Sequence, residues 1–184
     1  MTTGVTPADI LTFWREAGPD QWFADDPAFD LAVRSRFFAT HGAAARGGLI
    51  DWEHSAAGAL ALVLLFDQFP RNMFRGDARA FATDAMARAV AERALARGYD
   101  QATDSTMRPF FYLPFMHSEA LVDQDRCIRL YEALGDADQL RYAREHRAVA
   151  QFVGRGKAAA GRDRRRVGPD AARCRRGCRS GPAT

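Results

Sequence analysis

Apolar residues recur every three or four positions along most of the chain, which is the spacing of one face of an α-helix. Ile10, Phe13 and Trp14 follow this spacing near the start, and residues 29–37 repeat it. No stretch shows the sustained alternation of apolar and polar residues, rich in β-branched side chains, that is typical of a half-buried strand. The pattern therefore predicts an all-α protein with no sheet.

Helix start and stop signals divide this pattern into about seven helices. Thr6-Pro7 and Asp26-Pro27 each place a capping side chain before a proline, which is typical of a first helical turn. The most apolar segment is expected to be helical as far as Phe69, because Pro70 would interrupt it. The predicted helices begin near Thr6, Asp26, Ser55, Asp77 or Thr83, Ser105, Ser118 and Ala137.

A group of polar residues follows the most apolar segment directly. Asp67, Gln68, Arg71, Asn72 and Arg75 alternate with aromatic and other apolar residues. Apolar neighbours on both sides draw these polar groups toward the interior, where each of them needs a hydrogen-bonding partner. The segment is therefore either a structural polar lock or the floor of a binding site.

Length and composition fit one globular domain, which we place at residues 1–152. The chain has 184 residues, and 47% of them are hydrophobic. The longest uncharged apolar run, residues 56–66, is about half of the roughly 20 residues that span a bilayer, so we expect no membrane partner. The first residues lack the pattern of a secretory signal, and three cysteines make no disulfide framework. These features favour a cytoplasmic location.

The charge is divided unevenly between this domain and the rest of the chain. Residues 1–150 carry 16 Lys and Arg against 21 Asp and Glu, whereas residues 151–184 carry 10 against 2. Residues 153–184 are rich in Arg, Gly and Ala and almost devoid of large apolar side chains, so we expect a disordered tail. An out-of-frame reading of a GC-rich gene would have the same composition. Nucleic acid is not expected as a partner except through this basic tail.

A series of motifs runs in order through residues 8–152. It includes Asp-Gln-Phe-Pro-Arg-Asn at 67–72, Tyr-Leu-Pro-Phe-Met-His-Ser-Glu at 112–119, Asp123-Gln124 and His146-Arg147. These motifs resemble a bacterial family, the domain-of-unknown-function family numbered 924, and the chain departs from the family pattern after Phe152. The resemblance implies an all-α fold similar to tetratricopeptide arrays, and it implies no particular activity.

Arg71, Asn72 and Arg75 could act as an anion clamp. Two guanidinium groups near a helix end match the geometry of a carboxylate or phosphate. The alternative is an internal ion-pair network that includes Asp67 and fastens this segment to neighbouring helices.

His117 and Glu119 are the candidate catalytic residues. Histidine moves protons near neutral pH, and a nearby carboxylate could orient it. The alternative is a helix start in which Ser118 is the cap and His117 packs against aromatic residues. His117 and His146 match no zinc motif, so no metal is expected. The chain has no glycine-rich nucleotide-binding motif, and no cofactor is expected.

The large aromatic and methionine side chains are predicted to pack between helices. This set comprises Trp14, Trp22, Phe23, Phe37, Phe66, Phe69, Phe74, Phe81, Phe110, Phe111, Phe115 and Met116.

Three interpretations of function follow from these observations. The first is a binding module for a small anionic ligand or a peptide, and the second is an enzyme acting on a small anionic substrate. In the third, all the polar motifs are structural. Because polar groups in apolar surroundings can satisfy one another, we expect residues 67–75 to lie beside 117–119, with the arginines partly paired to Glu119 or Asp123. The candidate ligand-binding residues are Asp67, Arg71, Asn72, Arg75, His117, Glu119, Gln124 and His146.

Overall fold

The computed structural model describes residues 4–166, and only the backbone of residues 153–166. Its α-helices are α1 (Pro7–Ala17), α2 (Pro19–Trp22), α3 (Pro27–Ala45), α4 (Ala56–Phe66), α5 (Gln68–Met73), α6 (Asp84–Ala96), α7 (Leu113–Met116), α8 (Leu121–Leu134) and α9 (Ala137–Arg166). Short 3₁₀ helices lie at η1 (Ile50–His54), η2 (Ala78–Phe81) and η3 (Arg108–Phe111). The described residues contain no strand, so the all-α class is confirmed. The likeness to tetratricopeptide arrays stays a prediction.

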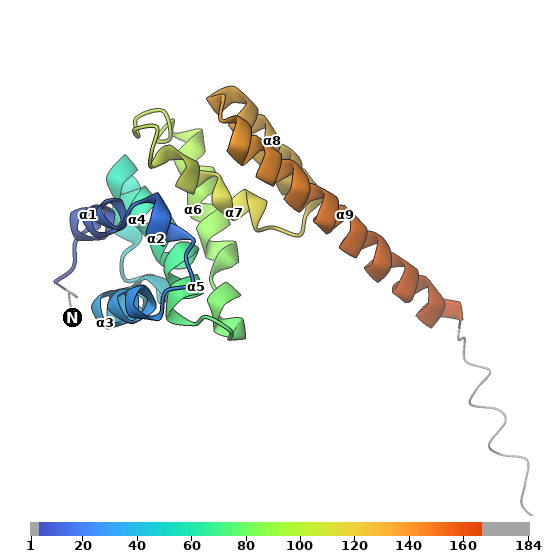
Figure 1. The fold of residues 1–184 in the computed structure, drawn as a ribbon, viewed down its shortest axis with the longest axis horizontal. Helices are drawn as coiled ribbons and strands as arrows, with labels where there is room; N and C mark the ends of the chain where they lie inside the picture. Colours follow the sequence, from blue (N-terminus) through green and yellow to red (C-terminus); the bar gives the residue numbers. More distant parts are fainter. Residues whose placement is uncertain (1–3, 167–184) are drawn as a thin grey trace, which may run out of the picture.

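Helix α4 forms the centre of the fold (Figure 1). Ser55 caps it by accepting a hydrogen bond from the Gly58 backbone N–H, and every residue from Gly58 to Phe66 is buried. Helices α1, α3, α5 and α6 all pack against it. A helix that is apolar on all sides needs such cover. Within the described part of the chain, neither α4 nor any other helix is long and apolar enough to cross a membrane.

The chain turns at Asp67, before the expected helix end at Phe69. The Asp67 backbone N–H still bonds to the Val63 carbonyl at 2.9 Å, and α5 begins at the next residue. Pro70 lies inside the first turn of α5, where it removes no helical hydrogen bond. The prediction that Pro70 ends the helix is therefore wrong. As a result, Asp67 sits at a joint between two helices, and Arg71 lies on α5 instead of in a loop.

The segment between α6 and α8 folds differently from the single short helix predicted near Ser105. It forms η3 and then the one-turn helix α7, each with a proline (Pro109 and Pro114) at its start. Residues 110–116 are buried, and α7 packs against both α6 and α8. This packing brings His117, which directly follows α7, toward the joint at Asp67.

Helices α8 and α9 pack against each other as a hairpin at one side of the domain (Figure 1). Gly135 ends α8 in the left-handed region, with φ 76° and ψ 16°, where glycine carries no steric penalty. Helix α9 continues past residue 152, the expected end of the domain, as far as Arg166. It therefore enters the segment that we expected to be a disordered tail. The rest of that prediction, residues 167–184, lies outside the described residues.

The contact between α4 and η1 should tolerate no added methyl group. A Cβ at Gly58 would lie 2.1 Å from the Trp52 carbonyl oxygen, so Gly58→Ala must displace η1. We expect it to lower the free energy of unfolding by roughly 1–3 kcal/mol in urea denaturation.

Gly42→Ala in α3 is the matched control, because its Cβ would meet only the flexible Arg46 guanidinium, at 3.3 Å. It should be neutral or stabilise the protein by about 0.5–1 kcal/mol. An equal loss of unfolding free energy in Gly58→Ala and Gly42→Ala would contradict the tight contact at Gly58.

Candidate functional site

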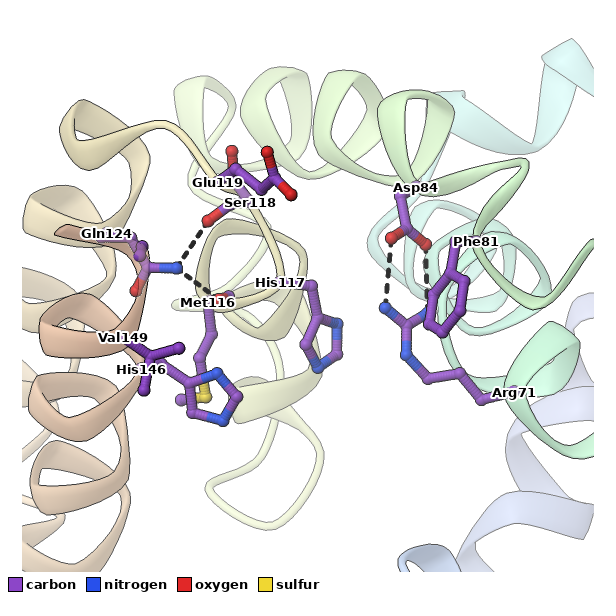
Figure 2. Close-up of a pocket in the computed structure, with 11 residues that line it drawn as sticks. Arg71, Phe81, Asp84, Met116, His117, Ser118, Glu119, Gln124, His146 and Val149 are labelled. Carbon is purple, nitrogen blue, oxygen red and sulfur yellow. Dashed lines mark hydrogen bonds and ion pairs between the residues drawn. The ribbon is translucent and has the colours of Figure 1, made fainter. Parts of the chain in front are cut away.

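The joint between α4 and α5 lies beside a cavity of about 320 Å³, which we call the His117 cavity. Its walls come from α5, η2 and α6 on one side, and from α8, α9 and the turn after α7 on the other (Figure 2). The lining residues are Arg71, Phe81, Asp84, Met116, His117, Ser118, Glu119, Gln124, His146, Val149 and Ala150. The candidates Arg71, His117, Glu119, Gln124 and His146 thus share one cavity, although they come from α5, the turn after α7, α8 and α9.

His117 is anchored at the edge of this cavity by Asp67. Its ring nitrogen Nδ1 lies 2.7 Å from Oδ1 of Asp67, whose side chain is completely buried. A carboxylate only accepts hydrogen bonds, so Nδ1 carries the hydrogen and donates it. The other ring nitrogen, Nε2, then has a lone pair when the ring is neutral. The His117 side chain is 19% exposed, so this ring remains accessible from the cavity.

Donors from three side chains compensate the charge of Asp67. Burial alone would raise its pKa, but the attraction and hydrogen bond of His117 and the charge of Arg71 outweigh burial and hold the pKa below its ordinary value. Gln68 also donates its side-chain amide to Oδ2. The Asp67 carboxylate is therefore ionised at neutral pH inside an apolar core, which requires that these partners stay in place.

Arg71 is committed to protein partners instead of facing the cavity as a free cation. Its guanidinium lies 3.2 Å from Oδ1 of Asp67, bonds to the Asp67 carbonyl, and forms a two-pronged pair with Asp84 at 3.1 and 3.2 Å. The Phe81 ring covers it at 5.5 Å (Figure 2). This arrangement matches the internal network that the sequence left as the alternative to an anion clamp.

Asn72 and Arg75 face α3 instead of the His117 cavity. Asn72 donates to Asp30 at 2.8 Å, and Arg75 makes a two-pronged pair with the same carboxylate at 2.7 and 2.9 Å. Both residues line a smaller cavity of about 170 Å³ that also reaches His117 and Arg71. They therefore attach α5 and the turn after it to α3.

Gln124 holds the turn between α7 and α8 in place. Its Nε2 donates to the carbonyl oxygens of Met116 and Ser118, each at 2.6 Å. The Ser118 hydroxyl in turn donates to Asp123 at 2.6 Å and accepts the Ala120 backbone N–H. The N-cap of α8 is Ala120, with no side-chain capping bond, so the expectation that Ser118 caps this helix is wrong, and Ser118 instead holds the turn before it.

His146 reaches the cavity from α9 (Figure 2). Partial burial lowers its pKa, and the nearby His117 lowers it further, so the ring is neutral at pH 7. The two histidines therefore come from separate elements, the turn after α7 and α9, and border the same cavity.

The expected proximity of the two polar segments is confirmed at Asp67 and His117, but the expected ion pairs are not. Asp123 lies 3.7 Å from Arg88, and the prediction that it pairs with Arg71 or Arg75 is wrong. Asp84 is the partner of Arg71 that the sequence reasoning missed.

Two aromatic residues that were predicted to be packed are exposed. Phe81 is 61% exposed at the rim of the His117 cavity, and Phe23 is 63% exposed. Phe23 lines a neighbouring cavity of about 360 Å³ that shares Met116, His117 and His146 with the first. The other members of the predicted aromatic core are buried. The two exceptions lie where the body of the domain faces α9.

No group of three or more His, Cys, Asp or Glu side chains within the described part of the chain is placed to hold a metal ion. The polar groups of the cavity instead offer hydrogen bonds and one histidine anchored by a carboxylate.

The chain is similar to proteins of one bacterial family. The model of the family described as "Bacterial protein of unknown function (DUF924)" matches residues 10–155. The chain belongs to this family. A solved structure of a protein of unknown function from Agrobacterium tumefaciens is 48% identical, with a TM-score of 0.78 over 80% of this chain and 84% of that one. No curated protein matches. The DUF924 match spans both walls of the His117 cavity.

Replacing Arg71 should test how much the fold depends on its ion pairs. In Arg71→Ala, the buried Asp67 loses a cationic partner and Asp84 loses its pair. We therefore expect the free energy of unfolding, measured by urea denaturation, to fall by about 2–4 kcal/mol. Arg79→Ala is the control, because it breaks an exposed pair with Asp77, which water and salt screen, so the variant should unfold much like the wild type. If both variants lost the same free energy of unfolding, the ion pairs of Arg71 would not stabilise the fold more than an exposed pair does.

Asp67→Asn should change how stability depends on pH. A carboxyl whose pKa is lowered in the folded state stabilises the protein above its unfolded pKa of about 4, and this contribution is lost as pH falls through the folded value. The variant should be less stable at pH 7 and should lose less stability between pH 5 and 3. Urea denaturation across this range measures both. A wild-type acid slope retained in the variant would contradict an ionised Asp67.

Proposed function

We propose that this DUF924 protein binds a small molecule in the His117 cavity. The observation that carries the proposal is the convergence of Arg71, Asp84, His117, Gln124 and His146, from five separate parts of the fold, on one cavity of about 320 Å³. Small-molecule sites have volumes of roughly 300–1,000 Å³ and combine apolar walls with a few oriented polar groups. The neighbouring cavity that shares His117 and His146 adds room for a larger ligand or a short peptide.

An enzyme that uses His117 as an acid–base group is the second candidate. The bond from Nδ1 to the buried Asp67 favours it, because such a carboxylate fixes the ring, leaves Nε2 as the reacting atom, and stabilises the charged ring after it takes a proton. Glu119 and His146 border the same cavity and would be the second acid–base groups. The reaction class would be proton abstraction from a bound ligand or from water.

The ion pairs of Arg71 and Arg75 remove the main support for a specifically anionic ligand. Both guanidinium groups are already neutralised by aspartates, so neither offers an unpaired positive charge. The purely structural interpretation explains these two arginines well. It does not explain why His117 and His146 border a cavity, which is the reason to prefer binding.

A fragment screen tests the proposal directly. We expect several small polar fragments to bind the full chain at millimolar concentration in saturation-transfer NMR, and to compete with one another for one site. His146→Ala should weaken binding at least fivefold without affecting the fold, since His146 is on the surface of α9. His117→Ala should abolish binding, with circular dichroism checking that the helices remain.

His54→Ala is the matched control, because His54 lies in η1 beside the Asp51 carbonyl, away from the cavity. It should bind like the wild type. The proposal would be contradicted if no fragment bound, or if neither His117→Ala nor His146→Ala weakened the binding.

A further inference from the structure

We infer that the ligand of this protein carries an uncharged aromatic ring, which binds in the cavity next to the His117 cavity. This second cavity has a volume of about 360 Å³, and we call it the Phe23 cavity. The inference rests on the proposed function and specifies its ligand class, in place of the anionic ligand expected from the sequence. Three features support it: the rings that line the cavity, the lack of charged side chains there, and its connection with the His117 cavity.

Most of the side chains that line the Phe23 cavity have flat rings or are easily polarised. The rings belong to Phe23, His117, Tyr142 and His146, and Met116 contributes a thioether. Aromatic rings favour other rings in stacked or edge-to-face arrangements, and a thioether makes favourable contacts with a ring edge. A protonated imidazole is also attracted to the face of an aromatic ring. The lining therefore favours an aromatic ring over an aliphatic group, whichever protonation state the two histidines have.

Two of these rings are exposed to solvent at the cavity. Phe23, which directly follows α2, is 63% exposed, and Tyr142 on α9 is 46% exposed. Leu113 and Met116 form a buried apolar part of the same lining. A ligand ring that covers the two exposed rings removes apolar surface from water, which favours binding. The cavity is large enough, since a dry cavity of about 150 Å³ can hold benzene.

The charged side chains of the site lie in the His117 cavity. Arg71, Asp84 and Glu119 line that cavity. No Asp, Glu, Lys or Arg is among the described residues that line the Phe23 cavity. A carboxylate or ammonium group on a ring bound there would lose its hydration and meet no permanently charged partner, which is costly. The ring is therefore expected to carry no charge.

The two cavities adjoin each other at Met116, His117 and His146, which line both (Figure 2). They also follow one face of α9. Tyr142, His146 and Val149 line them in order along this helix, and residues spaced three or four apart share a helix face. A ligand whose ring lies in the Phe23 cavity can therefore place a polar substituent next to the two histidines.

Four probes of similar size separate this ligand class from others. Benzyl alcohol has an uncharged aromatic ring, cyclohexylmethanol has the same carbon skeleton without aromaticity, and benzoate and benzylamine are charged at pH 7. They are titrated into the full chain labelled with ¹³C at the methionine methyl groups. We expect benzyl alcohol to bind at least about fivefold more tightly than each of the other three probes, because only it combines an aromatic ring with no charge. Its ring current should shift the methyl signal of Met116.

The methionine signals also report where the probe binds. Met116 lines both cavities of the site, whereas Met86 lines a separate cavity of about 220 Å³ beside η1. Met107 is fully buried, lines none of these three cavities, and is the internal reference. The variant Met116→Leu identifies the Met116 signal. A benzyl alcohol shift at Met86, with Met116 unchanged, would place the ring elsewhere and overturn the inference.

Variants give a second, independent measurement. Phe23→Leu removes one ring but keeps an apolar side chain, so the preference for benzyl alcohol over cyclohexylmethanol should fall at least about threefold. Phe38→Leu is the matched control, because Phe38 is an exposed aromatic residue of α3 that lines neither cavity, and it should keep the preference. The ratio between two probes is measured within each protein, so a small change in overall affinity does not affect the conclusion.

The outcomes distinguish the two proposals. If cyclohexylmethanol or a charged probe binds as tightly as benzyl alcohol and His117→Ala abolishes that binding, the aromatic ligand class is wrong while the binding site stands. The same holds if Phe23→Leu keeps the full preference. If the Met116 signal changes with protein concentration in the absence of any probe, a second copy of the chain covers the cavity, and the inference is overturned. If neither these probes nor any fragment binds, both proposals are contradicted.

Discussion

The buried negative charge of Asp67 is the constraint on which the rest of the site depends. An ionised carboxylate in an apolar core is stable only when donors surround it. His117, Arg71 and Gln68 supply those donors, and they come from the turn after α7 and from α5. The requirement to compensate one charge therefore joins the α4–α5 joint to the start of the α8–α9 hairpin. The His117 cavity lies where these parts meet.

The same constraint decides which side chains are available for a ligand. Arg71 compensates Asp67 and Asp84, so its charge is neutralised within the protein. His117 gives one nitrogen to Asp67 and keeps the other for the cavity. Gln124 uses its nitrogen to hold the turn that carries His117. The structural role of His117 and its proposed binding role thus fall on different nitrogens of the ring.

The helices and the proximity of Asp67 to His117 could be predicted from the sequence, because apolar spacing and buried polar motifs have direct physical consequences. The chain turn at Asp67 could not, since Pro70 is an equally good first-turn residue of a new helix. The partner of Arg71 was missed because Asp84 lies on another helix, and local sequence does not encode such a pairing. The orientation of the Gln124 amide depends on two carbonyls that only the folded turn brings together. The exposure of Phe23 and Phe81 likewise depends on how α9 stands against the body of the domain.

The protonation of the His117 ring at neutral pH tests the central claim most directly. The side-chain ¹⁵N resonances of His117, recorded on uniformly labelled full chain and assigned with His117→Gln, report which ring nitrogen carries the hydrogen. The account predicts that Nδ1 carries a hydrogen and that Asp67 protects this hydrogen from exchange. In Asp67→Asn the Nδ1 hydrogen should exchange faster. A wild-type ring whose Nδ1 carries no hydrogen, or whose Nδ1 hydrogen exchanges as fast as in Asp67→Asn, would contradict the account.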